Sequence, residues 1–173
     1  MIGGVRGAAP RSWLFVTALA CTAAVAVPAL DACAPPAGPD TWLDLVAEDP
    51  HGRPVRFSDF AGQVRVIDLW ASWCGPCRMT IPELNDLYER YRGRGLVVVG
   101  ISMDDDPAAV LEFQRQVPMR YPAAMYNPHL TAKMGQPTAI PTTLLVDRDG
   151  VLRRTFVGYV DVATLEAEVR GLL

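Results

Sequence analysis

Residues 64–79 read "VRVIDLWASWCGPCRM", and this stretch places two cysteines, Cys74 and Cys77, between two elements of secondary structure. Its first seven residues are an apolar, β-rich run of the length expected for a buried strand. From Gly75 onward, apolar residues recur at helical spacing until two glycines, at 93 and 95, end the pattern. A strand therefore runs into a helix, and both cysteines lie at the junction.

The composition is that of an ordinary globular protein. The chain has 173 residues, of which 50% are hydrophobic and 20% are charged, and this length is sufficient for one well-buried domain. Sixteen Lys and Arg against 19 Asp and Glu give a net charge of -3, and no basic run is long enough to follow a phosphate backbone. We therefore expect no nucleic-acid partner. We also expect a monomer.

Residues 1–32 are predicted to be a signal peptide or an N-terminal membrane anchor. Two arginines precede an uncharged stretch of 18 residues (13–30), and they would stay in the cytoplasm while the rest of the chain is exported. Residues 33–41 are Pro-rich and predicted to be a tether. The sequence "LDAC" at 30–33 resembles a lipobox, so Cys33 is a lipidation candidate, with an uncleaved anchor or cleavage to a soluble form as the alternatives.

Residues 42–173 carry the pattern of one α/β domain. Between the two glycines and the C-terminus, strand-like and helical segments alternate and then give way to a hairpin. We expect an edge hairpin over 42–57, a loop at 58–62, strands at 64–70 and 96–103, a helix at 105–117, a shorter strand and helix over 120–135, a hairpin at 142–158 and a last helix at 161–173. This order indicates a sheet with both parallel and antiparallel strands, flanked by helices.

Cys74 and Cys77 admit three interpretations: a redox pair, part of a metal site, or two small hydrophobic residues. An exported domain whose folded part holds only this pair has no disulfide framework, which favours a chemical role. Zinc needs four ligands, and the two histidines, His51 and His129, lie far apart in the sequence. Copper bound by the pair and His129 is left as an alternative, while the redox interpretation predicts no metal.

The segment "IDLWASWCGPCR" (67–78), followed by "AIPTTLLVDRDG" (139–150), resembles the thioredoxin superfamily. Three further features resemble its membrane-tethered TlpA/ResA branch: the inserted strand and helix at 118–138, the "SDFAGQ" loop and the exported anchor. The resemblance covers residues 42–173 and implies a thioredoxin-like fold: a central mixed β-sheet flanked by helices, an N-terminal β-hairpin and a central αβ insertion. It also implies a protein-disulfide reductase whose only cofactor is its own redox-active disulfide.

At two positions, this chain differs from the residues that are usual in the TlpA/ResA branch and in peroxidases of the same superfamily. Many members of the branch carry Glu three residues after the second cysteine, where this chain has Thr80, so the acid near the site is expected to be Asp68. Glu83, one helical turn further along, is interpreted as a solvated residue. A peroxidase of the same superfamily normally has Thr three residues before its nucleophile, and Ala71 stands there instead, which disfavours peroxidase activity.

The chemistry of a dithiol explains the residue types of the motif. Cys74 lies at the first turn of the helix, where free N–H groups and the helix dipole stabilise a thiolate, so it is the predicted nucleophile. Its attack on a client disulfide gives a mixed disulfide, which Cys77, one helical turn along, resolves. Gly75 leaves the Cys74 sulfur uncovered, and Pro76 stiffens the loop at a position whose N–H is not needed.

Asp68 lies six residues before Cys74 inside an otherwise apolar strand. Alternation points it to the same face as Val64 and Val66. Burial there should raise its pKa, so that it takes and returns the proton of Cys77 during resolution, and in thioredoxins a similar Asp has this role. The alternative is a strand-end Asp bonded to water or to backbone.

The resemblance also predicts a surface that binds the client. It implies that the Ile140–Pro141 bond is cis and faces the cysteines, and that the backbone of Ile140 pairs with an incoming peptide. A trans proline at a strand entry is the alternative. Trp73, beside the nucleophile, is the predicted client contact, and the substrate-binding candidates are Trp73, Gly75, Pro76, Ile140 and Pro141.

The Gly-Pro dipeptide and the Ile before the proline resemble reducing thioredoxins, with potentials of about -270 mV, rather than strong oxidants at about -120 mV. We therefore predict a reductant in the periplasm or on the outer face of the cytoplasmic membrane. It would draw electrons from a membrane thiol-reductase and reduce protein disulfides, such as Cys-x-x-Cys-His segments of apocytochromes c or copper-site cysteines. The alternatives are an oxidase or isomerase of exported proteins and a copper-binding assembly protein.

Overall fold

The computed structural model describes residues 42–173. The predicted signal peptide or anchor (1–32), the tether (33–41) and the lipidation candidate Cys33 lie outside the described residues. Within the described part, no helix is long and apolar enough to cross a membrane.

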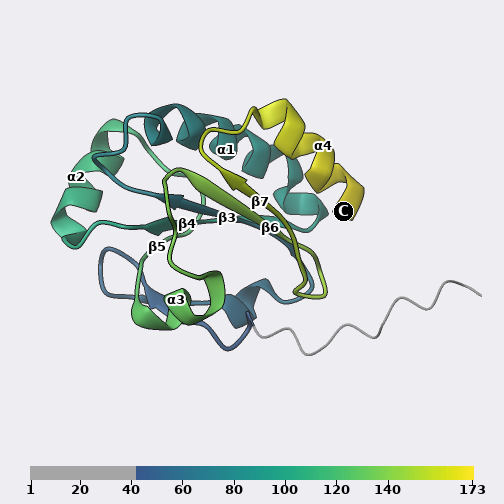
Figure 1. The fold of residues 1–173 in the computed structure, drawn as a ribbon, viewed down its shortest axis with the longest axis horizontal. Coiled ribbons are helices and arrows are strands. Elements are labelled where there is room, and N and C mark those ends of the chain that lie inside the picture. Colours follow the sequence, from purple (N-terminus) through teal and green to yellow (C-terminus); the bar gives the residue numbers. More distant parts are fainter. Residues whose placement is uncertain (1–41) are drawn as a thin grey trace, which may run out of the picture. The chain divides into compact units, whose positions relative to one another are not determined.

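A five-stranded mixed sheet forms the centre of the domain, in the order β5-β4-β3-β6-β7 (Figure 1). The three strands β3, β4 and β5 are parallel, β6 is antiparallel to β3, and β7 is antiparallel to β6. The strands are β3 (Val64–Trp70), β4 (Leu96–Ser102), β5 (Ala123–Met125), β6 (Thr142–Val146) and β7 (Leu152–Val157). This confirms the predicted mixture of parallel and antiparallel strands.

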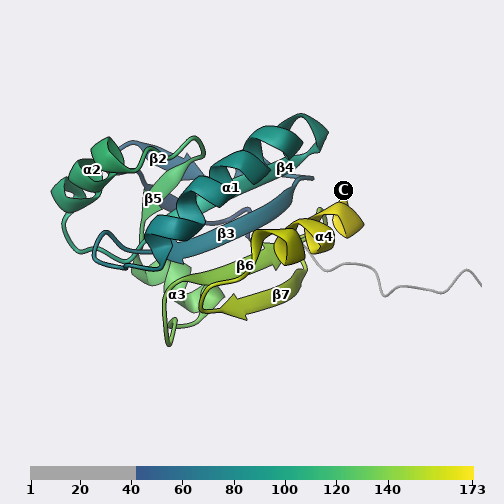
Figure 2. The same cartoon turned by 90° about the horizontal axis from the view of Figure 1, so that it is seen from above.

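Helices cover both faces of this sheet. On one face lie α1 (Cys77–Tyr91), α2 (Pro107–Gln116) and α4 (Val162–Leu172), and on the other lies α3 (Pro128–Met134) (Figure 1). Figure 2 shows α1 lying across β3 and β4 with α4 beside it, and α1 contacts both β4 and α4. A 3-10 turn, Arg92–Arg94, extends α1, and Gly95, with a φ of 95°, leads the chain into β4.

The side chains of β3 alternate between two apolar layers. Val64 and Val66 pack under α1 and α4, whereas Ile67 and Leu69 pack in the layer that includes α3. Because both faces are covered, all seven residues of β3 are buried. A strand buried on both sides needs an almost continuous apolar run, which is the pattern that the sequence has.

The N-terminal hairpin forms as predicted but is shorter. β1 (Val46–Glu48) and β2 (Pro54–Arg56) make an antiparallel sheet of their own instead of extending an edge of the central sheet. The carboxylate of Asp49 accepts the N–H groups of His51 and Arg53, both at 2.8 Å, and so fixes the turn. A 3-10 helix, Phe57–Phe60, replaces the predicted end of the hairpin and the first part of the predicted loop at 58–62, and the Phe57 side chain is buried in the core.

Candidate active site

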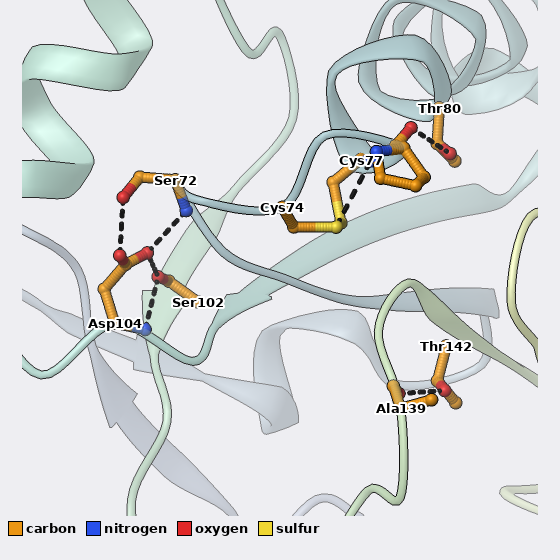
Figure 3. Close-up of a disulfide and its surroundings, with 9 residues drawn as sticks. Ser72, Cys74, Cys77, Thr80, Ser102, Asp104, Ala139 and Thr142 are labelled. Atoms are coloured by element: carbon orange, nitrogen blue, oxygen red, sulfur yellow. Dashed lines mark hydrogen bonds between the residues drawn. A yellow bond between two sulfur atoms is a disulfide. The ribbon is translucent and has the colours of Figure 1, made fainter.

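The two cysteines form a disulfide at the N-terminus of α1 (Figure 3). Their Cα atoms are 5.4 Å apart. Cys74 is 4% exposed and Cys77 is 0% exposed, so an attacking thiolate can approach only the Cys74 side of the bond. The backbone N–H of Cys77 lies 3.3 Å from Cys74 Sγ and donates to it. The first turn of α1 therefore already directs a donor at the sulfur that would carry negative charge.

A carboxylate ties the loop before Cys74 to the end of β4. Asp104 accepts the N–H of Ser72 at 2.9 Å and its hydroxyl at 2.6 Å, and it also accepts the hydroxyl of Ser102 at 2.7 Å (Figure 3). The N–H of Met103 donates to the carbonyl of Trp70 at 2.7 Å. These bonds fix the backbone that leads into the cysteine motif. Sequence reasoning missed Asp104, because it is the first of three consecutive aspartates and nothing local distinguishes it.

The Ile140–Pro141 bond is cis, as the resemblance implied. The Ile140 side chain is half-buried and packs against the cluster that contains Cys74, Cys77 and Trp70. The hydroxyl of Thr142 donates to the Ala139 carbonyl at 2.7 Å and holds this turn. The structure thus brings Ile140 to the cysteine pair, whereas the role of the Ile140 backbone in binding a client stays a prediction.

An apolar surface borders the disulfide. Trp73 is 70% exposed and, with Met103 and residues 137–140, lines a pocket of about 470 Å³. Gly75 and Pro76 are exposed at the start of α1. The pocket can hold a bulky apolar side chain beside Cys74. Met103 had no sequence signal, because its place in the pocket depends on where β4 ends next to the cysteine loop.

A second aromatic residue near Pro141 was also missed. The N–H of Gly158 donates to the Pro141 carbonyl at 2.8 Å, which places Tyr159 next to the cis peptide. The Tyr159 hydroxyl lies 3.1 Å from Glu83 Oε1 and donates to it. Glu83 is half-buried, and its bond to Tyr159, an exposed aromatic residue from the far end of the chain, is one that sequence reasoning did not predict.

Asp68 is fully buried on the α1 face of β3, in line with the predicted alternation. Burial raises its pKa to about 7, and the hydroxyl of Thr143, opposite it on β6, offsets part of this rise. Within residues 42–173, neither carboxyl oxygen has a hydrogen-bond partner of ordinary geometry. The backbone half of the alternative, a strand-end Asp bonded to backbone, is therefore wrong, whereas a bond to water stays a prediction. No hydrogen bond joins Asp68 to a cysteine of the described chain.

The described residues offer no cluster of three or more His, Cys, Asp or Glu side chains that could hold a metal ion. His129 is exposed near the start of α3, on the opposite face of the sheet from α1. The copper alternative, which needs His129 close to Cys74 and Cys77, gains no support from this arrangement.

Comparisons with known proteins agree with a redox-active cysteine pair at this site. Residues 27–170 match the model of the Redoxin family. Thiol-disulfide oxidoreductase ResA of Bacillus thuringiensis subsp. konkukian is 29% identical over 129 residues, 75% of each chain. ResA of Geobacillus kaustophilus is 24% identical over 132 residues, 76% of each chain. A putative thiol:disulfide interchange protein DsbE from Chlorobium tepidum has 31% identity and a TM-score of 0.69, covering 78% of this chain and 96% of its own. The chain therefore belongs to the Redoxin family of the thioredoxin superfamily and is a TlpA/ResA-like thiol–disulfide oxidoreductase.

Proposed function

We propose that the protein is an extracytoplasmic reductant of protein disulfides that cycles Cys74 and Cys77 between dithiol and disulfide. The observation that carries this proposal is the asymmetry of the pair. Cys74 Sγ accepts an N–H from the helix terminus at 3.3 Å and belongs to the more exposed cysteine, whereas Cys77 is fully buried. This asymmetry supports attack on the client by Cys74 and resolution by Cys77.

The cycle moves two electrons from the protein to the client. The Cys74 thiolate forms a bond to one client sulfur, and the client disulfide breaks to release a thiolate that takes a proton from water. Cys77 then gives its proton to Asp68 and attacks Cys74 Sγ, so that the internal disulfide forms and the second client thiolate leaves. A carboxyl with a pKa of about 7 is well matched to accept this proton near neutral pH.

The reducing direction rests on the Gly75–Pro76 dipeptide and on Ile140 before the cis proline, which resemble reducing thioredoxins. In an oxidising compartment, a membrane thiol-reductase would return the two electrons to the internal disulfide. Client disulfides would bind as extended peptides along the Ile140–Pro141 turn, with a bulky apolar side chain in the pocket beside Trp73. Cys-x-x-Cys-His segments of apocytochromes c and copper-site cysteines are the two proposed client classes.

A single-turnover experiment tests this function against the copper alternative. Reduced protein mixed with an oxidised Cys-x-x-Cys-His peptide is expected to transfer two electrons per molecule, with the decrease in peptide disulfide measured by mass spectrometry. His129→Ala should leave the rate unchanged, because His129 lies on the opposite face of the sheet from α1. Tight copper binding that is lost in His129→Ala, together with no disulfide turnover, would instead support the copper-binding function.

We further propose that residues 1–32 export the domain, that 33–41 tether it, and that Cys33 is the site of lipidation. The protein would then act as a monomer at the membrane. The mass of the mature N-terminal peptide tests this: a lipid on Cys33 is expected, whereas a chain that begins at Met1, or one shortened and without lipid, would contradict lipidation.

A further inference from the structure

Around the middle of β3, four buried side chains carry polar atoms that, within residues 42–173, have no hydrogen-bond partner of ordinary geometry. They are the carboxyl oxygens of Asp68, Nε1 of Trp70, the hydroxyl of Tyr121 and the hydroxyl of Thr143. The dithiol cycle uses only the first of these groups. Leaving a buried polar group unpaired destabilises the fold, so a cluster of such groups calls for an explanation.

The sheet register places these groups together. Asp68 pairs with Gly100 of β4 on one side and with Thr143 of β6 on the other, and paired residues of neighbouring strands direct their side chains to the same face. A Cβ atom added to Gly100 would lie 2.6 Å from Met119 Cε, 3.0 Å from Trp70 Nε1 and 3.2 Å from Tyr121 Cε2. The indole and the phenol, together with the end of the Met119 side chain, therefore occupy the space over Gly100, the β4 partner of Asp68.

The polar groups also complement one another chemically. Trp70 Nε1 can only donate, the ionised carboxylate of Asp68 can only accept, and the hydroxyls of Tyr121 and Thr143 can do both. A buried water needs two to four such partners, and this set supplies them. Burial, together with the charge of Asp68, raises the pKa of Tyr121 well above 10. Tyr121 therefore keeps its proton throughout the working pH range and is always able to donate.

We propose that Tyr121 is a positioning residue for the proton acceptor: its hydroxyl, through an internal water shared with Trp70 Nε1 and Thr143, stabilises the ionised carboxylate of Asp68. Asp68 can then accept the Cys77 proton at a lower pH than burial alone would allow. This inference rests on the proposed role of Asp68 in the dithiol cycle.

The groups that face Asp68 are few. β4 presents Gly100, β6 presents Thr143, the segment before β5 presents Tyr121, and Cys77 is the titratable residue at the adjoining start of α1. Among the described residues, no charged side chain shifts the pKa of Asp68. The neutral donors of Tyr121, Thr143 and Trp70 are therefore the groups through which the surroundings can favour the carboxylate.

Tyr121→Phe tests the proposal, because it removes the hydroxyl and keeps the ring. The full-length protein is followed in single turnover, and the rate of release of the second client thiol is measured from pH 5 to pH 9. We expect the midpoint of the variant to lie about one pH unit above that of the wild type. Its rate at pH 6 should fall roughly tenfold and its plateau at high pH should be unchanged, since loss of a hydrogen bond to a charged group is of this size.

Two further variants provide a matched control and an independent test. Tyr88→Phe is the matched control, because Tyr88 packs edge-to-face on Tyr121 with ring centroids 6.4 Å apart and its hydroxyl is outside the cluster. It should leave the midpoint unchanged. Thr143→Val keeps the side-chain shape and should raise the midpoint of the pH profile as Tyr121→Phe does. It provides the test if the Tyr121→Phe variant does not fold. A wild-type midpoint in the Tyr121 variant, or a rate lowered equally at every pH, would overturn the proposal.

A direct titration separates this inference from the proposed function. The ¹³C carboxyl resonance of Asp68 in the oxidised protein reports its pKa without turnover. A higher value in Tyr121→Phe supports the positioning role even if Asp68→Asn turns over at the wild-type rate, an outcome that would reject Asp68 as proton acceptor. An unchanged value in Tyr121→Phe overturns the positioning role whatever the kinetics of Asp68→Asn are.

Discussion

Replacing Cys77 with serine is expected to stop the cycle at a mixed disulfide between Cys74 and its client. Turnover of a protein disulfide should fall by roughly a thousandfold or more, because the resolving sulfur is gone. The adduct should accumulate in a ratio of one client to one protein and be reversed by dithiothreitol. Intact-protein mass spectrometry under non-reducing conditions measures it directly.

Cys74→Ser is the matched control for this experiment. It leaves only Cys77, which is fully buried, whereas Cys74 is 4% exposed and lies against the helix N-terminus. No adduct should therefore form on the time scale of the Cys77→Ser reaction. An adduct on Cys77 that forms as fast as the one on Cys74 would contradict the assignment of the nucleophile.

Asp68→Asn is expected to stabilise the oxidised protein above pH 7. In the folded state the pKa of Asp68 is raised to about 7, whereas its ordinary value is 3.8. The folded protein thus keeps a proton that the unfolded chain has lost, and its stability falls as pH rises from about 4 to about 7. At 1.36 kcal/mol per pH unit, the loss is on the order of 4 kcal/mol as an upper limit. Asparagine keeps the shape and cannot ionise, so it avoids this loss.

Denaturant unfolding of the oxidised protein between pH 4 and pH 9 measures the effect. The free energy of unfolding should fall with pH across this window in the wild type and change much less in Asp68→Asn, with the two proteins closest near pH 4. Asp86→Asn, at an exposed position of α1, should follow the wild type. Parallel curves for the wild type and Asp68→Asn would contradict the account of Asp68 as a buried acid with a raised pKa.

The parts of the fold that the sequence predicted are those set by local pattern. The apolar run of β3 matches its bounds, Val64–Trp70, because a strand covered on both faces has apolar residues at nearly every position. Its alternation also placed Asp68 on the correct face. The cysteines could be paired because a spacing of three residues at a helix start brings two side chains together without help from distant residues.

The parts that escaped prediction depend on contacts between distant residues. Asp104 holds Ser72, 32 positions away, and Glu83 receives the hydroxyl of Tyr159, 76 positions away. Tyr121 packs over Gly100, the β4 partner of Asp68, where an added Cβ atom would lie 3.2 Å from its ring. Periodicity and short motifs describe neighbours along the chain, so none of these partners could be named before the sheet order was known.

The reduction potential of the Cys74–Cys77 pair tests the central claim most directly. The domain of residues 42–173 would be equilibrated in glutathione and dithiothreitol buffers, with the fluorescence of tryptophan, including Trp70 and Trp73 beside the pair, as the readout. A value below about -230 mV is the predicted result and fits a reductant supplied with electrons from the membrane. A value above about -180 mV would contradict it, because such a dithiol would be an oxidant or isomerase of exported proteins.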